Sequence, residues 1–294
     1  MATRKVTINR ENKDRLFNFI FGRKENQKWT LQLYNAVNHS NYRKPDEIKF
    51  NTLDNFLYVS MKNDTSFIFA GCMNLFEHQS TYNPNIPVRL MQYIAQLYEG
   101  YIVDNKLDKY GETLIELPVP RLVVFYNGEE DIRDEVLLNL SDSFDKRLCE
   151  KADIEVKVRM LNINAGHNKD LMEACKPLSE YSWFVETIRQ HKKTMSLEDS
   201  VTQAIQGMPD SYEIKSFLKL HLAEVNSMLS MEYQEKNAKD LIAKANFKKG
   251  KESRDKEKIT EMLKDGKTPE AIADFCKYPL EQVKKVQEEL LAEV

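Results

Sequence analysis

The first half of the chain combines two patterns of hydrophobic positions. Apolar residues recur at helical spacing over three stretches, 13–22, 29–38 and 86–103. Alternating or continuous apolar runs, which are typical of strands, occupy 47–53, 55–61, 64–70, 73–79, 121–128 and 154–164. Helices and strands that follow one another in this way predict an α/β fold with a central sheet.

The pattern changes after residue 168, from where only helical spacing is found. Amphipathic stretches continue to about residue 245, and Ser196 is a suitable N-cap for one of them. The stretch 244–258 is rich in charge and has little to bury, so we expect an exposed helix or a linker. The sequence therefore predicts three parts, an α/β core (1–168), a helical extension (169–245) and a C-terminal unit (246–294).

The C-terminal unit contains three short helical stretches, 258–264, 269–276 and 280–291. Thr268 can cap the second stretch, and Pro269 suits its first helical position. Three short helices are compatible with helix-turn-helix packing. Two interpretations stay open, a unit that reads DNA and a plain dimerisation or capping unit.

One predicted hairpin places polar residues among apolar strand positions. In NDTSFIFAGCMNLFEHQ (63–79), Ala70-Gly71 is a turn signal that makes the two flanking runs antiparallel partners. Opposed residues then have numbers that add up to the sum of 70 and 71. Asp64 therefore lies opposite Glu77, with Cβ atoms about 5 Å apart. Gln79 follows Glu77 by two residues and shares its face.

Two opposed carboxylates repel each other unless a cation or a proton lies between them. Mg²⁺ and Mn²⁺ prefer carboxylate oxygens, and such an ion can polarise a phosphodiester and activate a bound water. A metal-binding pair is one interpretation of Asp64 and Glu77. In the other interpretation, Asp64 begins its strand at the solvent-exposed end and Glu77 faces water.

Composition limits the classes of protein that need to be considered. The 294 residues suffice for one sizeable core and a smaller unit, and no run of about 18 apolar residues suggests a membrane span. The N-terminus lacks the apolar stretch of a signal peptide. The four cysteines are widely spaced, which favours a reducing cytoplasm over a disulfide scaffold or a zinc site.

Charge is unevenly distributed along the chain, although the net charge of −3 does not itself suggest a nucleic-acid partner. Residues 1–50 carry eleven Lys/Arg against five Asp/Glu, whereas residues 51–150 carry eight against sixteen. A basic leading segment beside an acidic core suits a phosphate-binding rim around a metal centre. A solvated surface with uneven charge explains the same counts, so charge alone does not decide.

Several blocks of sequence resemble one known family. EHQSTYNPNIPVR (77–89) is a specific block, and FNFIFG, LVVFYNG and VRMLNINAGHN extend the match over roughly residues 13–235. These blocks are similar to the Rpn family of recombination-promoting nucleases and transposases, within the PD-(D/E)XK nuclease superfamily. The resemblance implies an αβββαβ restriction-endonuclease-like core with a mixed sheet, followed by an all-α C-terminal region.

The resemblance also implies roles for four residues. Asp64 and Glu77 match the two motif acids that hold Mg²⁺ or Mn²⁺. Asp14 matches an acid on the leading helix that supports the metal or the water, although the helix dipole alone would also favour an acid there. Gln79 stands where the superfamily usually has lysine, and an amide can orient a water but cannot act as a base. Activity should therefore depend strongly on the divalent ion and rise with pH.

Residues around this motif are candidates for contacts with phosphate. Lys62, Ser80, Thr81 and Arg89 could bind phosphate oxygens, and capping or surface solvation is the alternative for each. His78 alternates away from Glu77, so we expect it to pack in the sheet. The other histidines have no partner at catalytic spacing in the sequence, namely His39, His167, His191 and His221.

The sequence and the resemblance together favour a cytoplasmic, metal-dependent DNA endonuclease acting in recombination, transposition or defence. A homodimer is expected, because cutting both strands calls for two active sites, and no membrane partner is expected. The alternative is a protein with the nuclease fold that binds DNA or another partner without catalysis. A ribonuclease is a third hypothesis, because nothing in these residues distinguishes the sugar of the substrate.

Overall fold

A computed structural model of the protein describes residues 16–51 and 65–292. The predicted strand at 55–61 and three candidate site residues, Asp14, Lys62 and Asp64, lie outside the described residues. The Cα packing divides the chain into two compact units, Met1–Ser230 and Met231–Val294. The predicted three-part division stays a prediction, because compactness alone does not show which segments fold independently.

The first unit is built around a mixed β-sheet whose described strands follow the order β1-β2-β3-β4-β6-β5. The strands are β1 (Lys49–Phe50), β2 (Thr65–Phe69), β3 (Cys72–Gln79), β4 (Val119–Tyr126), β5 (Glu135–Asn139) and β6 (Lys157–Asn162). Strands β3, β4 and β6 run parallel, and the remaining neighbours pair antiparallel. The carboxyl ends of the three parallel strands therefore meet at one edge of the sheet. The sequence pattern does not predict β5.

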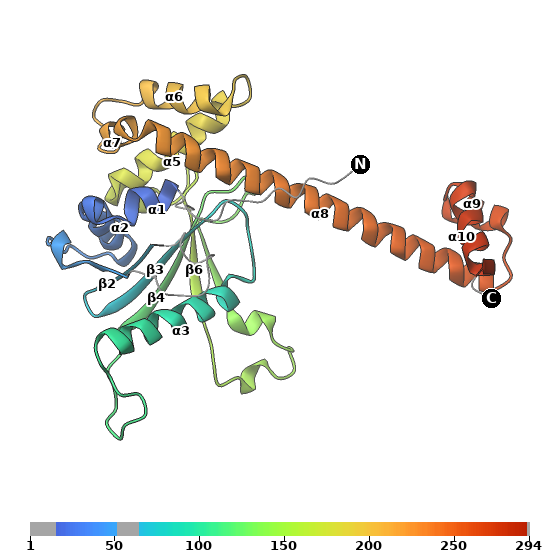
Figure 1. Cartoon of the computed structure of the whole chain (residues 1–294), viewed down its shortest axis with the longest axis horizontal. Helices are drawn as coiled ribbons and strands as arrows, with labels where there is room; N and C mark the ends of the chain where they lie inside the picture. Colours follow the sequence, from blue (N-terminus) through green and yellow to red (C-terminus); the bar gives the residue numbers. More distant parts are fainter. Residues whose placement is uncertain (1–15, 52–64, 293–294) are drawn as a thin grey trace. The chain divides into compact units, whose positions relative to one another are not determined.

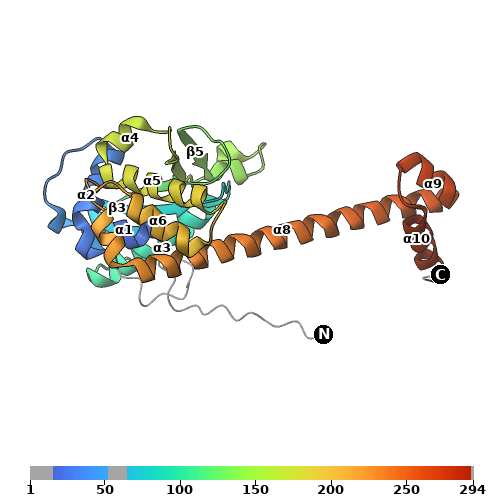
Figure 2. The ribbon, with the colours of Figure 1, turned by 90° about the horizontal axis from the view of Figure 1, so that it is seen from above.

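Helices cover both faces of this sheet (Figure 1). On one face, Leu90 and Leu97 of α3 (Ile86–Asp104) pack in the same core as Met73 and Leu75 of β3. Figure 2 shows the opposite side, which α1 (Leu16–Phe21), α2 (Gln27–Asn38) and α5 (Lys176–His191) cover. The larger core lies there and includes Phe17, Phe21, Phe67, Phe76, Phe125, Tyr181 and Phe184. These layers confirm the predicted mixed α/β, PD-(D/E)XK-like fold.

The β2–β3 hairpin has the register that its sequence predicts. Thr65 pairs with Phe76 and Phe69 pairs with Cys72, so that paired residue numbers add up to 141. The two turn residues have left-handed backbone angles, with φ of 50° at Ala70 and 73° at Gly71. Positive φ at both central positions is what a type I′ hairpin turn requires. The turn fixes the register, and the register decides which face each β3 residue occupies.

The helices that follow β6 complete the first unit. They are α4 (Lys169–Ala174), α5, α6 (Leu197–Gly207), α7 (Lys215–Leu220) and the start of α8 (Leu222–Lys264), and 3₁₀ turns occupy Lys24–Asn26, Pro45–Glu47, Leu140–Ser143 and Cys149–Lys151. Ser196 caps α6 by accepting a hydrogen bond from the Asp199 N–H at 3.1 Å, as predicted. Glu180 of α5 is buried and accepts the backbone N–H groups of Glu213 and Ile214, each at 3.0 Å. This carboxylate therefore ties α5 to the start of α7.

The second unit contains the end of α8, α9 (Pro269–Cys276) and α10 (Leu280–Ala292). Its core is formed by Ile259, Ile272, Val283 and Val286. Thr268 caps α9 by accepting the Ala271 N–H at 3.3 Å, and Pro269 begins the helix, as predicted. The predicted separate helix at 258–264 is wrong. These residues continue α8, because no proline interrupts the chain there and its many lysines and glutamates are good helix formers.

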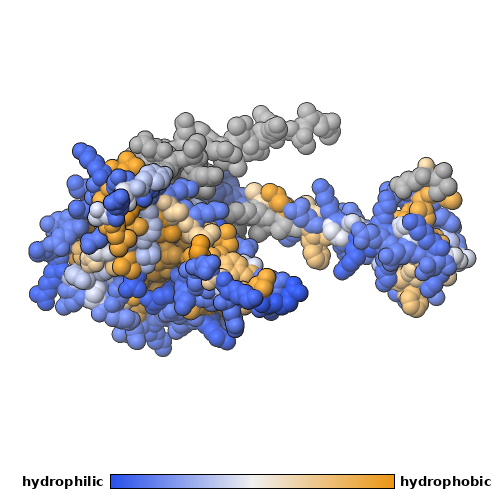
Figure 3. Space-filling view, turned by 90° about the horizontal axis from the view of Figure 1, so that it is seen from below, coloured by the Kyte–Doolittle hydropathy of each residue, from blue (hydrophilic) through white to orange (hydrophobic). Residues whose placement is uncertain are grey.

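The surface of the first unit is mostly hydrophilic, with apolar side chains among the hydrophilic ones on the side that carries α3 (Figure 3). Tyr110, Leu114 and Leu117, in the segment that joins α3 to β4, are exposed apolar residues. None of the described helices combines the length and the apolar character that crossing a bilayer requires.

Candidate functional site at the carboxyl end of strand β3

Glu77 and Gln79 lie near the carboxyl end of β3 and face helix α3. Side chains alternate between the two faces of a strand, and Met73 and Leu75 of the same strand pack in the α3 core. Glu77 is 1% exposed and Gln79 is 8% exposed. The interpretation in which Glu77 faces water is therefore wrong.

His78 points to the opposite face of the sheet. Its Nε2 atom lies 3.1 Å from the Tyr181 hydroxyl, and its ring stacks on Phe17 with centroids 5.3 Å apart. The residue is buried in the larger core. This confirms the prediction that His78 is a packed strand histidine.

One carboxylate oxygen of Glu77 accepts two hydrogen bonds from side chains. The Gln79 amide donates to Oε1, and the Arg89 guanidinium donates to the same oxygen at 2.7 Å. Arg89 is the fourth residue of α3, and its Nη2 also lies 3.4 Å from the Tyr93 hydroxyl. A buried carboxylate needs such donors, because removing a charge from water is costly.

The other candidate residues differ in where the structure places them. Ser80 and Thr81 are exposed in the segment between β3 and α3, where a phosphate could reach them. The Thr65 hydroxyl donates to Asn18 Oδ1 at 2.8 Å and so joins α1 to the start of β2. Thr65 directly follows Asp64, and Asn18 lies four residues after Asp14. The hydrogen bond between Thr65 and Asn18 thus joins residues that are close in sequence to Asp64 and Asp14.

The edge that carries Gln79 continues onto the next two strands. Gln79 pairs with Tyr126, and Tyr126 pairs with Asn162. Neighbouring strands lie about 4.8 Å apart, so Asn162 lies roughly 10 Å from Gln79 across the sheet. The loops after β4 and β6 leave the sheet at this edge, where ligands commonly bind in α/β proteins.

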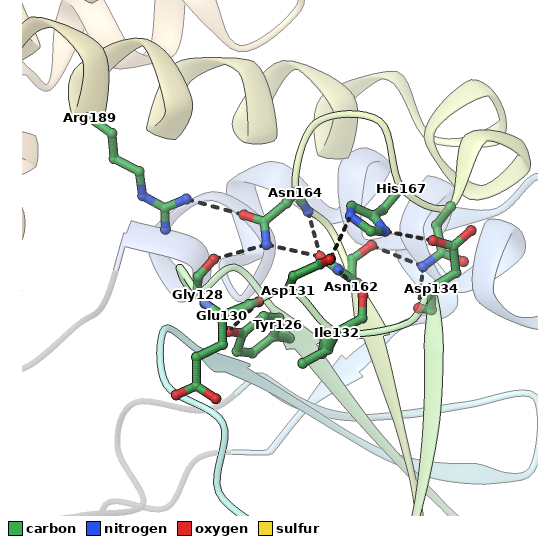
Figure 4. A network of polar contacts seen from close by, with 11 residues as sticks. Tyr126, Gly128, Glu130, Asp131, Ile132, Asp134, Asn162, Asn164, His167 and Arg189 are labelled. Carbon is green, nitrogen blue, oxygen red and sulfur yellow. Dashed lines mark hydrogen bonds and ion pairs between the residues drawn. The ribbon is translucent and has the colours of Figure 1, made fainter.

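A network of polar contacts joins these two loops (Figure 4). The Asn164 side-chain amide donates to the Gly128 carbonyl at 3.0 Å, and Arg189 of α5 donates to Asn164 Oδ1 at 3.1 Å. Arg189 also donates to the Asn127 carbonyl, and the Asn127 N–H donates to the Gln79 carbonyl at 2.8 Å. The network therefore connects α5 and both loops to the end of β3.

His167 extends this network to the acidic part of the loop after β4 (Figure 4). Its Nδ1 atom lies 2.7 Å from Asp134 Oδ1, and its Nε2 atom lies 4.0 Å from Asp131 Oδ1. The hydrogen bond to His167 holds the pKa of the Asp134 carboxyl below its usual range. Spacing along the sequence does not reveal this partner of His167. Asp134 is 33 residues away in the sequence and meets His167 only through the fold.

Tyr126 shapes the same loop from within the core. Its hydroxyl donates to the Glu130 carbonyl and accepts the Glu130 N–H, each at 3.0 Å, and burial raises the pKa of the hydroxyl. A Cβ atom at Gly128 would lie 2.3 Å from this hydroxyl oxygen. A side chain at position 128 would therefore have to displace the Tyr126 ring.

The sequence contains weak signals for several residues of this edge that do not belong to one local motif. Asn127, Asn162 and Asn164 end or follow strands that run parallel to β3, so their edge is the edge of Gln79. Arg89 lies in the first turns of a helix, where the dipole disfavours a cation unless an acid is near. That position could have suggested an acidic partner such as Glu77.

The donors near Glu77 suit a hard divalent ion in their chemistry. A buried carboxylate and a neighbouring side-chain amide offer oxygen ligands of the kind that Mg²⁺ and Mn²⁺ prefer. Within residues 16–51 and 65–292, no group of three or more His, Cys, Asp or Glu is placed to hold a metal ion. A metal site at Glu77 would therefore draw on an acid from outside these ranges, and Asp64 is the candidate.

Residues 45–216 match a protein family described as putative transposase, YhgA-like. The match spans more than half of the 294 residues and includes Glu77, Gln79 and Arg89. The chain belongs to this family. The YhgA-like family is of the PD-(D/E)XK type, which confirms the resemblance seen in the sequence. No curated protein and no solved structure matches the chain.

Proposed function

We propose that this YhgA-like protein is a metal-dependent DNA endonuclease that hydrolyses phosphodiester bonds in recombination or transposition. Asp64 and Glu77 would hold Mg²⁺ or Mn²⁺, and Gln79 would position the attacking water. Asp14 would support the metal or the water from the leading helix. The family match supports the transposase setting, and the geometry at Glu77 supports the chemistry.

The burial of Glu77 is the observation that carries this proposal. A strand carboxylate that only keeps a surface soluble is not expected to be 1% exposed, because burial of an unneeded charge is costly. Extended by one residue, the pairing rule that holds from Thr65 to Phe69 would make Asp64 the partner of Glu77. Two carboxylates in that arrangement would repel each other, and a bound cation would relieve this repulsion.

The chemistry would be shared between the bound ion and the chain's own groups. The ion would polarise the phosphodiester and lower the pKa of its bound water. Gln79 can hold a water through a hydrogen bond, but an amide cannot accept the proton of that water. Because the chain lacks a lysine at this position, we expect the cleavage rate to rise with pH.

Binding of DNA would involve polar residues around the site. Lys62, Ser80 and Thr81 are placed in the sequence just before or just after the motif residues and would contact phosphate oxygens. Cleavage of both strands calls for two active sites, so we propose that the protein works as a homodimer.

Plasmid nicking tests the catalytic assignment. Supercoiled plasmid is incubated with the protein in Mg²⁺ or in EDTA, and the nicked and linear forms are quantified. We expect Asp64→Ala and Glu77→Gln to lose at least a hundredfold in rate, because each change removes a metal ligand. Arg159→Met, on the opposite face of the sheet, is the control and should cleave like the wild type. Residual activity in Asp64→Ala equal to the wild type would exclude Asp64 from the mechanism.

A second candidate is a nuclease-fold protein that binds DNA without cleaving it. Gln79 favours this candidate, since it lacks the charge of the lysine usual in the superfamily. Thermal unfolding with and without Mn²⁺ separates the two, because a ligand that binds the folded state raises the melting temperature. DNA binding with neither cleavage nor stabilisation by Mn²⁺ would favour the second candidate. An RNA duplex assayed in parallel tests the ribonuclease hypothesis.

A further inference from the structure

Glu77 and Arg89 form an ion pair whose two ends have different environments. The Glu77 side chain is 1% exposed, whereas the Arg89 side chain is 36% exposed. The guanidinium lies beside the Tyr93 ring, 5.8 Å from its centroid. One end of the pair is therefore fixed in the sheet, and the other end reaches solvent next to the site.

Arg89 has the chemistry to bind either a carboxylate or a phosphate. A guanidinium presents its N–H groups in a planar fork that matches both anions, and it stays charged at every relevant pH. Arg89 approaches Glu77 from helix α3, so the backbone need not move for its side chain to turn from Glu77 toward solvent. Arg89 can therefore change partners by side-chain rotation.

The charges at the site suggest when this exchange would occur. Glu77 and Arg89 carry opposite charges, so this pair has no net charge. A divalent ion at Glu77 adds two positive charges next to Arg89, and a phosphodiester group brings one negative charge. A guanidinium next to a bound divalent ion is repelled by that ion and attracted by a phosphate.

We propose that Arg89 neutralises Glu77 until a divalent ion binds there, and that it then binds a phosphate of the substrate. This inference rests on the proposed function. With this exchange, binding of the ion and binding of DNA favour each other. The ion releases Arg89 for the phosphate, and the phosphate holds Arg89 away from the ion. Arg89 thus couples occupancy of the metal site to binding of the substrate.

The chain contains a matched control for this arginine. Arg159 of β6 donates to Glu135 at 2.9 Å, and its side chain is 38% exposed, close to the value for Arg89. Glu135, unlike Glu77, is 45% exposed. Arg159→Met therefore removes an arginine–carboxylate pair whose geometry is similar to that of Arg89 and Glu77. The carboxylate of this control pair is not buried, and the pair lies away from the site.

Calorimetric titration with Mn²⁺, without DNA, tests the first half of the proposal on the full chain. We expect Arg89→Met to bind Mn²⁺ at least tenfold more tightly than the wild type, because the guanidinium no longer has to leave Glu77. Arg159→Met should bind like the wild type. Arg89→Gln keeps a hydrogen-bond donor for Glu77 and should behave like Arg89→Met, which guards against a failure of the methionine variant to fold. An unchanged or weaker Mn²⁺ affinity in the Arg89 variants would overturn the proposal.

Fluorescence anisotropy with a labelled DNA duplex tests the second half. The assay uses Ca²⁺ or EDTA at one fixed salt concentration, because affinity for DNA depends on salt. We expect Ca²⁺ to raise the DNA affinity of the wild type and of Arg159→Met at least tenfold. This gain should be lost in Arg89→Gln. An equal gain in Arg89→Gln would overturn the role of Arg89 at the phosphate.

The titration separates failure of this inference from failure of the proposed function. If the wild type binds no Mn²⁺, or if Asp64→Ala binds it equally well, the metal site itself is wrong and both proposals fall. If Mn²⁺ binding is lost in Asp64→Ala but unchanged in the Arg89 variants, only the exchange by Arg89 is wrong.

Discussion

The interaction between Glu77 and Arg89 can be measured as a free energy of unfolding. Arg89→Met removes the guanidinium that donates to Glu77 Oε1, and it keeps the Gln79 donor and an apolar stem beside Tyr93. Removal of one partner from a buried ion pair costs about 3–5 kcal/mol. Because the Arg89 side chain is 36% exposed, we expect the lower end of that range, about 3 kcal/mol.

The two remaining variants complete a double-mutant cycle. Glu77→Gln leaves Arg89 able to reach solvent, so we expect a loss of about 1 kcal/mol, the size of one hydrogen bond. The double variant has no buried charge at this position and should also lie about 1 kcal/mol below the wild type. The expected coupling energy between the two residues is therefore about 3 kcal/mol.

Urea unfolding in EDTA measures the four free energies, with the midpoint and the slope fitted for each variant. The same cycle with Glu135→Gln and Arg159→Met is the control, and its coupling should stay below about 1 kcal/mol, because both partners are exposed. A coupling of Glu77 and Arg89 below about 0.5 kcal/mol, as found for independent sites, would refute the view that Arg89 neutralises a buried carboxylate.

Three further predictions concern the hairpin, the loop after β4 and a buried acid. Gly71→Ala should lower the free energy of unfolding by about 1–2 kcal/mol, because φ is 73° there although the added Cβ meets no atom within 4 Å. Gly207→Ala, which also has open space but lies in a helix, should instead raise it by about 0.4–1 kcal/mol in the same urea assay. Gly128→Ala should displace the Tyr126 hydroxyl and lower the melting temperature, and an unchanged melting temperature would contradict the close approach of 2.3 Å. Burial raises the pKa of Glu180 above 4.5, so the stability that this residue contributes is complete below pH 4.5 and is lost as the pH rises through the higher folded-state value. Glu180→Gln should therefore gain stability relative to the wild type as the pH rises from 4.5 toward neutrality, and a difference that does not change with pH would count against this linkage.

The register of the β2–β3 hairpin could be predicted because the signal is local. Gly71 and the apolar runs on either side of it determine the turn, and the turn determines which residues pair. The burial of Glu77 follows from the same register once α3 covers that face. The pairing of Asp64 itself lies outside the described residues and stays a prediction.

The rest of the site could not be predicted, because it depends on contacts between distant parts of the chain. Arg189 meets Asn127 across 62 residues, and no local pattern marks either residue. Strand β5 is an edge strand in which Glu135 and Leu137 are exposed, so its alternation of apolar and polar residues is weak. Its strand geometry comes from pairing with β6 rather than from its own sequence.

The loop after β4 places negative charge at one side of the sheet edge that carries Gln79. Residues 129–134 contain four acids and one arginine, and His167 and Tyr126 hold this loop at the sheet edge shared with Gln79. Charges within roughly 8 Å of one another, about one Debye length in physiological salt, are only partly screened. On the proposed function, these acids would repel a phosphate backbone from the β4–β6 side. A nucleic acid bound as proposed would then approach from the side of β2 and the start of α3, so that the proposed site would accept its substrate from one side.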